Sequence, residues 1–192
     1  MKKFFQKKNN AYPNCCAKRC GRGFTLVETL VAISIFTISI LGLMSVLGSS
    51  IANATYAKQK STASYLAQEG IEYLRNMRDT AVLYNATDAQ TGWNVFRATA
   101  TGVCSGGGCY IRDNGTLQSC GLSCTSPLLY SASGRYGYTS GTNSSFTRTI
   151  TVTPISVGGV INDLKIVSRV SWVQGSGSYN VTFSEDLFNW VE

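Results

Sequence analysis

Four cysteines in the C-terminal half have a spacing that suits either oxidation or metal binding. Cys104, Cys109, Cys120 and Cys124 form the pattern C-x4-C-x10-C-x3-C in a stretch rich in Gly and Ser. Cysteines of exported proteins usually form disulfides, whereas four thiolates can also hold zinc. Two disulfides are predicted for an exported chain, with a zinc site as the alternative. Neighbouring pairs would close the smallest loops, but three connectivities remain open.

No other group of residues indicates catalysis or a resident cofactor. The chain has no histidine, which removes the commonest general base near neutral pH and the commonest zinc ligand. It also lacks the G-x-S-x-G, P-loop and HExxH patterns, and its acidic residues are scattered. Cys15, Cys16 and Cys20 lack a fourth ligand, so reduced thiols are predicted there rather than a zinc site. We expect no enzyme activity, no cofactor and no metal.

The positive charge of the chain is confined to its N-terminus. The formal net charge is +7, and seven Lys and Arg residues precede Phe24 with no acidic residue among them. Residues 24–192 hold ten basic and ten acidic side chains, so this larger part is neutral. The basic pI therefore gives no reason to expect a nucleic-acid partner.

A long apolar segment follows the basic residues. Residues 24–47 contain one ionisable side chain, Glu28, and as a helix they are long enough to cross about 30 Å of hydrocarbon. The apolar run is too long for an ordinary secretory signal peptide. The preceding Lys and Arg cluster predicts a cytoplasmic N-terminus and an exported C-terminal part. A carboxylate in the bilayer requires a partner, so Glu28 is expected to have one.

The hexapeptide from Gly23 to Glu28, Gly-Phe-Thr-Leu-Val-Glu, resembles the class III signal of type IV pilins and type II secretion pseudopilins. The resemblance implies that a prepilin peptidase cuts after Gly23 and methylates the new N-terminal residue, Phe24. It also implies that Glu28 pairs with the N-terminal ammonium of a neighbouring subunit, and that an assembly platform and ATPase are partners. The leader of 23 residues is longer than that of many pilins, and the expected helix has no proline.

The helix is predicted to continue beyond the membrane. Apolar residues at helical spacing, including Tyr65, Ile71 and Leu74, give residues 48–84 one apolar face. This resembles the second half of the long helix of a pilin. The fold class is therefore predicted as α+β, the type IV pilin fold, with the long N-terminal helix covering an antiparallel sheet.

From about Asp88 the composition predicts sheet and loop. Alternating apolar residues predict strands at 146–154, 164–173 and 179–183, joined at Gly158-Gly159 and at Gly175-Ser176-Gly177. They are expected to form an antiparallel meander. The ending from 170 to 192 resembles minor pilins of the PilV-like group.

These predictions divide the chain into four parts. Residues 1–23 are a cleaved leader, 24–47 a transmembrane half-helix, 48–84 its amphipathic continuation, and 85–192 an extracytoplasmic β domain with the cysteine loop 104–124. The predicted function is a minor pilin or pseudopilin of a filament anchored in the bacterial inner membrane, with membrane lipid and other subunits as partners. Pilus, secretion and competence filaments are not distinguished.

A binding module on the same scaffold is the alternative: a tip-displayed adhesin or a DNA-uptake receptor. Such a module would use the cysteine loop or exposed aromatics, and DNA uptake would require exposed arginines to cluster. The candidate residues are Tyr130, Tyr136, Tyr138, Arg112, Arg135 and Arg148.

Overall fold

The computed structural model describes residues 23–85, 88–157 and 159–190. The predictions for the leader cysteines Cys15, Cys16 and Cys20 fall outside the described residues. The chain divides into two compact units, Met1–Gly48 and Ser49–Glu192. In the described part of the first unit the backbone is helical from Leu26 onward, and all side chains are exposed.

Helix α1 runs from Leu26 to Leu83 and crosses from the first unit into the second. No proline interrupts it, and Glu28 in its first turn suits the positive end of the helix dipole. Within the second unit its buried residues recur every three or four positions and form one stripe against the sheet. They are Ala63, Leu66, Ala67, Gly70, Ile71, Leu74 and Val82.

Helix α2 spans Ala89–Cys104, where the sequence was expected to form sheet and loop. That expectation is wrong for this segment. Asp88 caps the helix by accepting a hydrogen bond from the Thr91 backbone N–H at 2.6 Å. Trp93, Phe96 and Ala100 recur at helical spacing and are buried. Both signals are present in the sequence, but the abundance of Thr and Gly around them obscured the periodicity.

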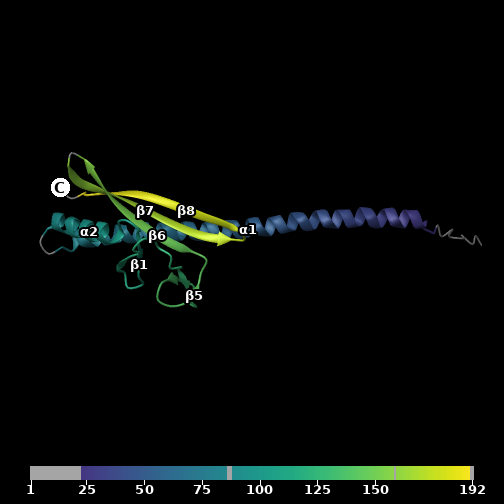
Figure 1. The fold of residues 1–192 in the computed structure, drawn as a ribbon, viewed down its shortest axis with the longest axis horizontal. Helices are drawn as coiled ribbons and strands as arrows, with labels where there is room; N and C mark the ends of the chain where they lie inside the picture. The colour runs from purple at the N-terminus through teal and green to yellow at the C-terminus, as the bar shows by residue number, and fades with distance from the viewer. Residues whose placement is uncertain (1–22, 86–87, 158, 191–192) are drawn as a thin grey trace, which may run out of the picture. The chain divides into compact units, whose positions relative to one another are not determined.

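The main sheet has the strand order β2-β1-β6-β7-β8 and is antiparallel throughout. Strands β1 (Cys109–Ile111) and β2 (Leu117–Ser119) are short. Strands β6 (Thr147–Val157), β7 (Val160–Gln174) and β8 (Gly177–Phe188) are long and form the predicted meander. Figure 1 shows these three strands alongside the second half of α1. The α+β class with a long N-terminal helix is confirmed.

A second, smaller sheet has the order β4-β3-β5. Its strands are β3 (Leu129–Tyr130), β4 (Tyr136–Gly137) and β5 (Thr142–Asn143), with only two residues each. A hydrogen bond from the Leu128 N–H to the Phe146 carbonyl joins this sheet to the start of β6. The small sheet is therefore formed by the segment of chain that connects β2 to β6.

The core of the second unit lies between its two helices and the main sheet. One cluster joins Ile71 and Leu74 of α1 to Trp93 of α2 and to Ile166 of β7. A second cluster surrounds Trp172 of β7. An ion pair at the sheet edge adds to this contact, since Arg75 Nη2 lies 2.6 Å from Glu185 Oε1 on β8. The two helices are thus fixed on one face of the sheet.

Candidate functional site: the N-terminal signal and the cysteine loop

The start of α1 is defined by a threonine. The Thr25 hydroxyl oxygen accepts a hydrogen bond from the Glu28 backbone N–H at 3.2 Å, and the Thr25 carbonyl accepts one from the Thr29 N–H. Thr25 is therefore the N-cap and Glu28 the third helical residue, which is the T-x-x-E spacing of a capping box. Sequence reasoning assigned roles to Gly23, Phe24 and Glu28 but missed Thr25, although the spacing alone indicates a helix start.

The cap leaves the Gly23–Phe24 peptide bond outside the helix. Residues 23–25 are not helical, and the Phe24 side chain is 78% exposed. A protease needs an extended and accessible backbone, and Gly23 adds no side chain that could obstruct it. Chemically, this junction can be cut without unwinding the helix that follows.

The segment from Phe24 to Leu47 has the properties of a membrane span. Its large apolar side chains are exposed, and α1 is the one helix in the described residues that is long and apolar enough to cross a membrane. The hydroxyls of Thr29, Ser34, Thr37 and Ser39 donate to carbonyls three or four residues earlier. The polar groups are thereby satisfied within the helix, as hydrocarbon surroundings require.

Glu28 is the exception in this segment. Its backbone N–H is bonded, but its carboxylate has no hydrogen-bond or ion-pair partner within the described part of the chain. An unpaired carboxylate in hydrocarbon costs several kcal/mol by typical scales, about 2.5 or more. The described residues thus leave this charge for another group to neutralise.

The cysteine loop contains two disulfides, Cys104–Cys109 and Cys120–Cys124. Of the three connectivities left open by the sequence, the structure has neighbouring pairs. Cys104 and Cys109 are buried and join the end of α2 to β1, whereas Cys120 and Cys124 are half-buried. Because the four sulfur atoms are joined in pairs, they offer no thiolate to a metal. No group of residues in the described ranges has the composition of a metal site.

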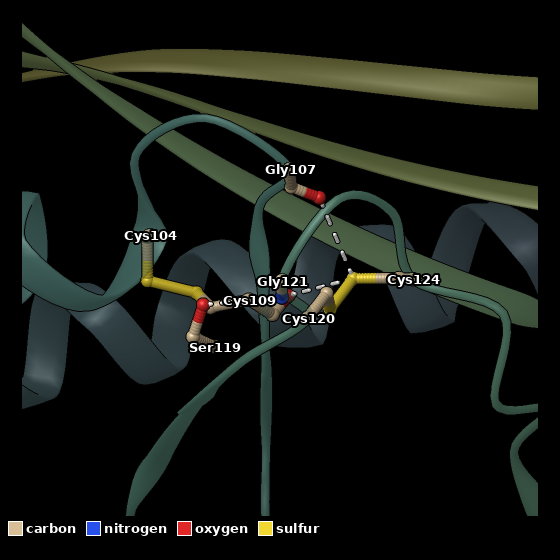
Figure 2. The surroundings of a disulfide bond; sticks show 7 residues. All are labelled: Cys104, Gly107, Cys109, Ser119, Cys120, Gly121 and Cys124. Atoms are coloured by element: carbon tan, nitrogen blue, oxygen red, sulfur yellow. Dashed lines mark hydrogen bonds between the residues drawn. A yellow bond between two sulfur atoms is a disulfide. The ribbon is translucent and has the colours of Figure 1, made fainter.

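The Cys120–Cys124 disulfide packs against the backbone of residues 107–109, in the loop closed by Cys104–Cys109 (Figure 2). Cys124 Sγ lies 3.6 Å from the Cys109 carbonyl oxygen and 4.0 Å from that of Gly107. A disulfide sulfur has no hydrogen to donate, so we regard these approaches as packing contacts. They hold the loop 120–124 beside β1.

Comparison with known families gives a match at the N-terminus. Residues 18–44 match the model of the prokaryotic N-terminal methylation motif. The chain carries the class III signal of type IV pilins. The match covers the last of the basic N-terminal residues, the Gly23–Phe24 junction, the capped start of α1 and most of the apolar segment. No curated protein and no solved structure matches the chain.

Downstream of the class III signal, the structure brings together residues that the sequence keeps far apart. Arg112, Arg135 and Arg148 line one cavity of about 360 Å³, together with Tyr136. Tyr130 is 46% exposed and lies 5.0 Å from Tyr136 between ring centroids. The arginines were named as candidates for a binding module, and no sequence pattern connects them.

Proposed function

We propose that the chain is a structural subunit, a minor pilin or pseudopilin, of a type IV pilus or a related filament. The observation that carries the proposal is the coincidence of the methylation motif at residues 18–44 with an exposed, non-helical Gly23–Phe24 junction. Prepilin peptidase cuts this junction and methylates the amino group of Phe24. The class III signal favours a structural subunit over an enzyme.

In this proposal the four parts of the chain have separate roles. The leader 1–23 is removed, and 24–47 anchors the protein in the inner membrane with its N-terminus in the cytoplasm. Residues 48–84 connect the anchor to the extracytoplasmic domain 85–192. An assembly platform and an ATPase then draw the subunit out of the membrane.

Assembly exchanges lipid for neighbouring helices. The apolar side chains of residues 24–47 have no covering partner within the described chain, so lipid or other subunits must cover them. In the filament, the Glu28 carboxylate pairs with the N-terminal ammonium that cleavage creates on a neighbouring subunit. This pairing removes the charge that α1 alone leaves unpaired.

The test is coexpression of the full chain with a prepilin peptidase, followed by mass measurement of the intact product. The expected product begins at Phe24 and carries one added methyl group. Gly23→Val should block cutting because a branched side chain then flanks the junction, whereas Gly21→Ala should leave it unchanged. A product cut elsewhere, or an uncut chain, contradicts the proposal.

A second role on the same scaffold, a tip-displayed adhesin or a DNA-uptake module, is favoured by one observation. The three candidate arginines share a cavity with Tyr136 of the small sheet. Arg148 is buried, however, and Glu69 and Asp113 also line this cavity. This balance of charge favours a small acidic ligand over a polyanion such as DNA.

A further inference from the structure

The cavity of about 360 Å³ lies where four distant segments meet. Tyr73 comes from α1, Arg112 from the turn between β1 and β2, Arg135 and Tyr136 from the small sheet, and Arg148 from β6. The turn is held close to the helix, since Gly115 lies against the Tyr73 hydroxyl. A volume of this size is at the lower end of the range for small-molecule sites, about 300 to 1,000 Å³.

A buried guanidinium forms part of the cavity wall. Arg148 is 5% exposed, and its Nη1 donates to Glu69 Oε2 at 2.8 Å and to the Leu66 carbonyl at 3.1 Å. Its Nε has no hydrogen-bond partner among the described residues. Burying a charged donor without an acceptor is costly, so this Nε calls for an acceptor such as the neighbouring Tyr138 hydroxyl or a water molecule.

The acidic groups of the cavity are already engaged. Glu69 accepts from Arg148, and Asp113 accepts from the backbone N–H groups of Tyr138 and Thr139 at 2.8 and 3.0 Å. The side chains of Arg112 and Arg135 are exposed and make no hydrogen bond or ion pair within the described part of the chain. Arg135 also acts on Asp113, because its positive charge helps to lower the pKa of that carboxyl group. With three arginines against two carboxylates, the net charge of the cavity is positive.

The small sheet has the composition of a recognition surface. Residues 126–145 are dominated by Ser, Tyr, Gly and Asn, the residues that antibody paratopes use for adaptable hydrogen bonds and rigid aromatic contacts. Asp113 fixes the segment after β4 through its two backbone bonds, and the rings of Tyr110 and Tyr138 pack in a tilted arrangement with their centroids 4.6 Å apart. The surface is thus pre-organised, which reduces the entropy lost on binding.

We propose that this cavity binds an acidic sugar, a hexuronate residue of a surface polysaccharide. Arg112 and Arg135 hold the carboxylate, the Ser133 hydroxyl bonds a ring hydroxyl, and Tyr136 packs against the ring. The Ser131 hydroxyl shapes the wall instead, since it donates to the Arg135 carbonyl and accepts from the Arg135 N–H. A neutral sugar leaves the two guanidinium groups without an acceptor. The site lies outside the class III signal and does not depend on the filament role.

The test uses the full chain in a zwitterionic detergent that contains no sugar. Saturation-transfer difference NMR measures the binding of methyl glucuronoside and of methyl glucoside, which differ only in the carboxylate. We expect binding of the glucuronoside and at least about tenfold weaker binding of the glucoside, because a hydrogen bond to a charged group contributes about one decade of affinity.

Paired variants assign the binding to the cavity. Arg112→Gln with Arg135→Gln should weaken glucuronoside binding about tenfold or more. Arg169→Gln should leave it unchanged, since Arg169 is exposed on β7 beside Thr149 and Thr182 and lines another hollow. Intrinsic tryptophan fluorescence checks that each variant is folded.

Three results overturn the proposal. Equal binding of the two glycosides removes the role of the carboxylate, and unchanged binding in the double arginine variant moves the site elsewhere. Stronger binding of N-acetyl-aspartyl amide or of a single-stranded oligonucleotide than of the glucuronoside assigns the arginines to an acidic peptide or to nucleic acid.

Discussion

Arg148 of β6 donates a hydrogen bond from Nη1 to Glu69 Oε2 of α1 at 2.8 Å, with the guanidinium buried and the carboxylate half-exposed. This pair joins the helix to the sheet at the wall of the arginine cavity, which is the cavity lined by Arg112, Arg135 and Arg148. Arg148 also donates to the Leu66 carbonyl, so its position is set by two acceptors on the same helix.

We predict that Glu69→Gln lowers the free energy of unfolding by about 1 to 2 kcal/mol, because it leaves the buried guanidinium without its counter-charge. In an Arg148→Met background the same change should have almost no effect, which a double-mutant cycle measures. Denaturant unfolding followed by the fluorescence of the buried Trp93 and Trp172 provides the readout. The control is Glu72→Gln, whose exposed pair with Arg75 should contribute less than about 0.5 kcal/mol. Equal effects of Glu69→Gln in both backgrounds would contradict the coupling.

Asp113 makes the stability of the second unit depend on pH. Its pKa is lowered from 3.8, first by the Thr139 side chain and then by the Tyr138 backbone N–H. A lowered pKa stabilises the folded protein above the ordinary pKa, and this contribution is lost as pH falls through the folded pKa. Asp113→Asn should therefore be less stable than wild type near pH 6, and the difference should shrink as the pH falls below 3.8. A difference that is constant from pH 6 to pH 2 would refute this linkage.

The sequence predicted the elements that have a long periodic pattern or a local motif. Helix α1 and the β6–β8 meander follow from periodicity over long segments, and Gly23 to Glu28 is a local motif. Helix α2 was missed because the capping role of Asp88 and the spacing of Trp93 and Phe96 were outweighed by composition. The two-residue strands of the small sheet have no periodicity to detect.

The arginine cavity was beyond sequence reasoning for a different reason. Arg112, Arg135 and Arg148 belong to three separate segments, and only the tertiary fold brings them to one wall. The charge that the cavity presents to a ligand could not be predicted either. Asp113 and Glu69 accept hydrogen bonds from donors that are distant in the sequence. The disulfide pairing depends likewise on how α2 meets β1.

The two disulfides should differ in their response to reductant. Cys104 and Cys109 are fully buried, whereas Cys120 and Cys124 are half-buried, so a thiolate reaches the second pair more easily. Timed reduction with dithiothreitol, alkylation and peptide mass mapping should show Cys120–Cys124 reduced first. Replacement of Cys120 and Cys124 by alanines should lower the free energy of unfolding by about 2 kcal/mol, as expected for a short loop. Earlier reduction of Cys104–Cys109 would show that this pair opens without unfolding the core.

Gly70 sets the distance between α1 and the sheet. A Cβ at this position would lie 2.8 Å from Ser168 Oγ and 3.2 Å from Ile150 Cδ1. Gly70→Ala should therefore destabilise the protein by about 1 to 3 kcal/mol, despite the higher helix propensity of alanine. A Cβ at Gly102 in α2 would meet nothing within 4 Å. Gly102→Ala should therefore stabilise the protein by about 0.5 to 1 kcal/mol. Adding Ser168→Ala to Gly70→Ala should recover part of the loss, since it removes the clashing oxygen. Chemical denaturation measures all three, and a stabilising Gly70→Ala would mean that the helix moves freely over β7.

We predict that a substitution of Glu28 separates membrane insertion from assembly. If its carboxylate pairs with a neighbour's N-terminal ammonium, Glu28→Gln should insert normally, because a neutral amide is easier to bury than a carboxylate. Incorporation into filaments should fall at least about tenfold, since breaking a buried ion pair typically costs 3 kcal/mol or more. Ser34→Ala is the matched control, because the Ser34 hydroxyl bonds only the Val31 carbonyl of its own helix. Membrane fractionation gives the inserted amount, and immunoblots of sheared filaments give the incorporated amount. If Glu28→Gln enters filaments as well as Ser34→Ala does, the carboxylate has no role in assembly.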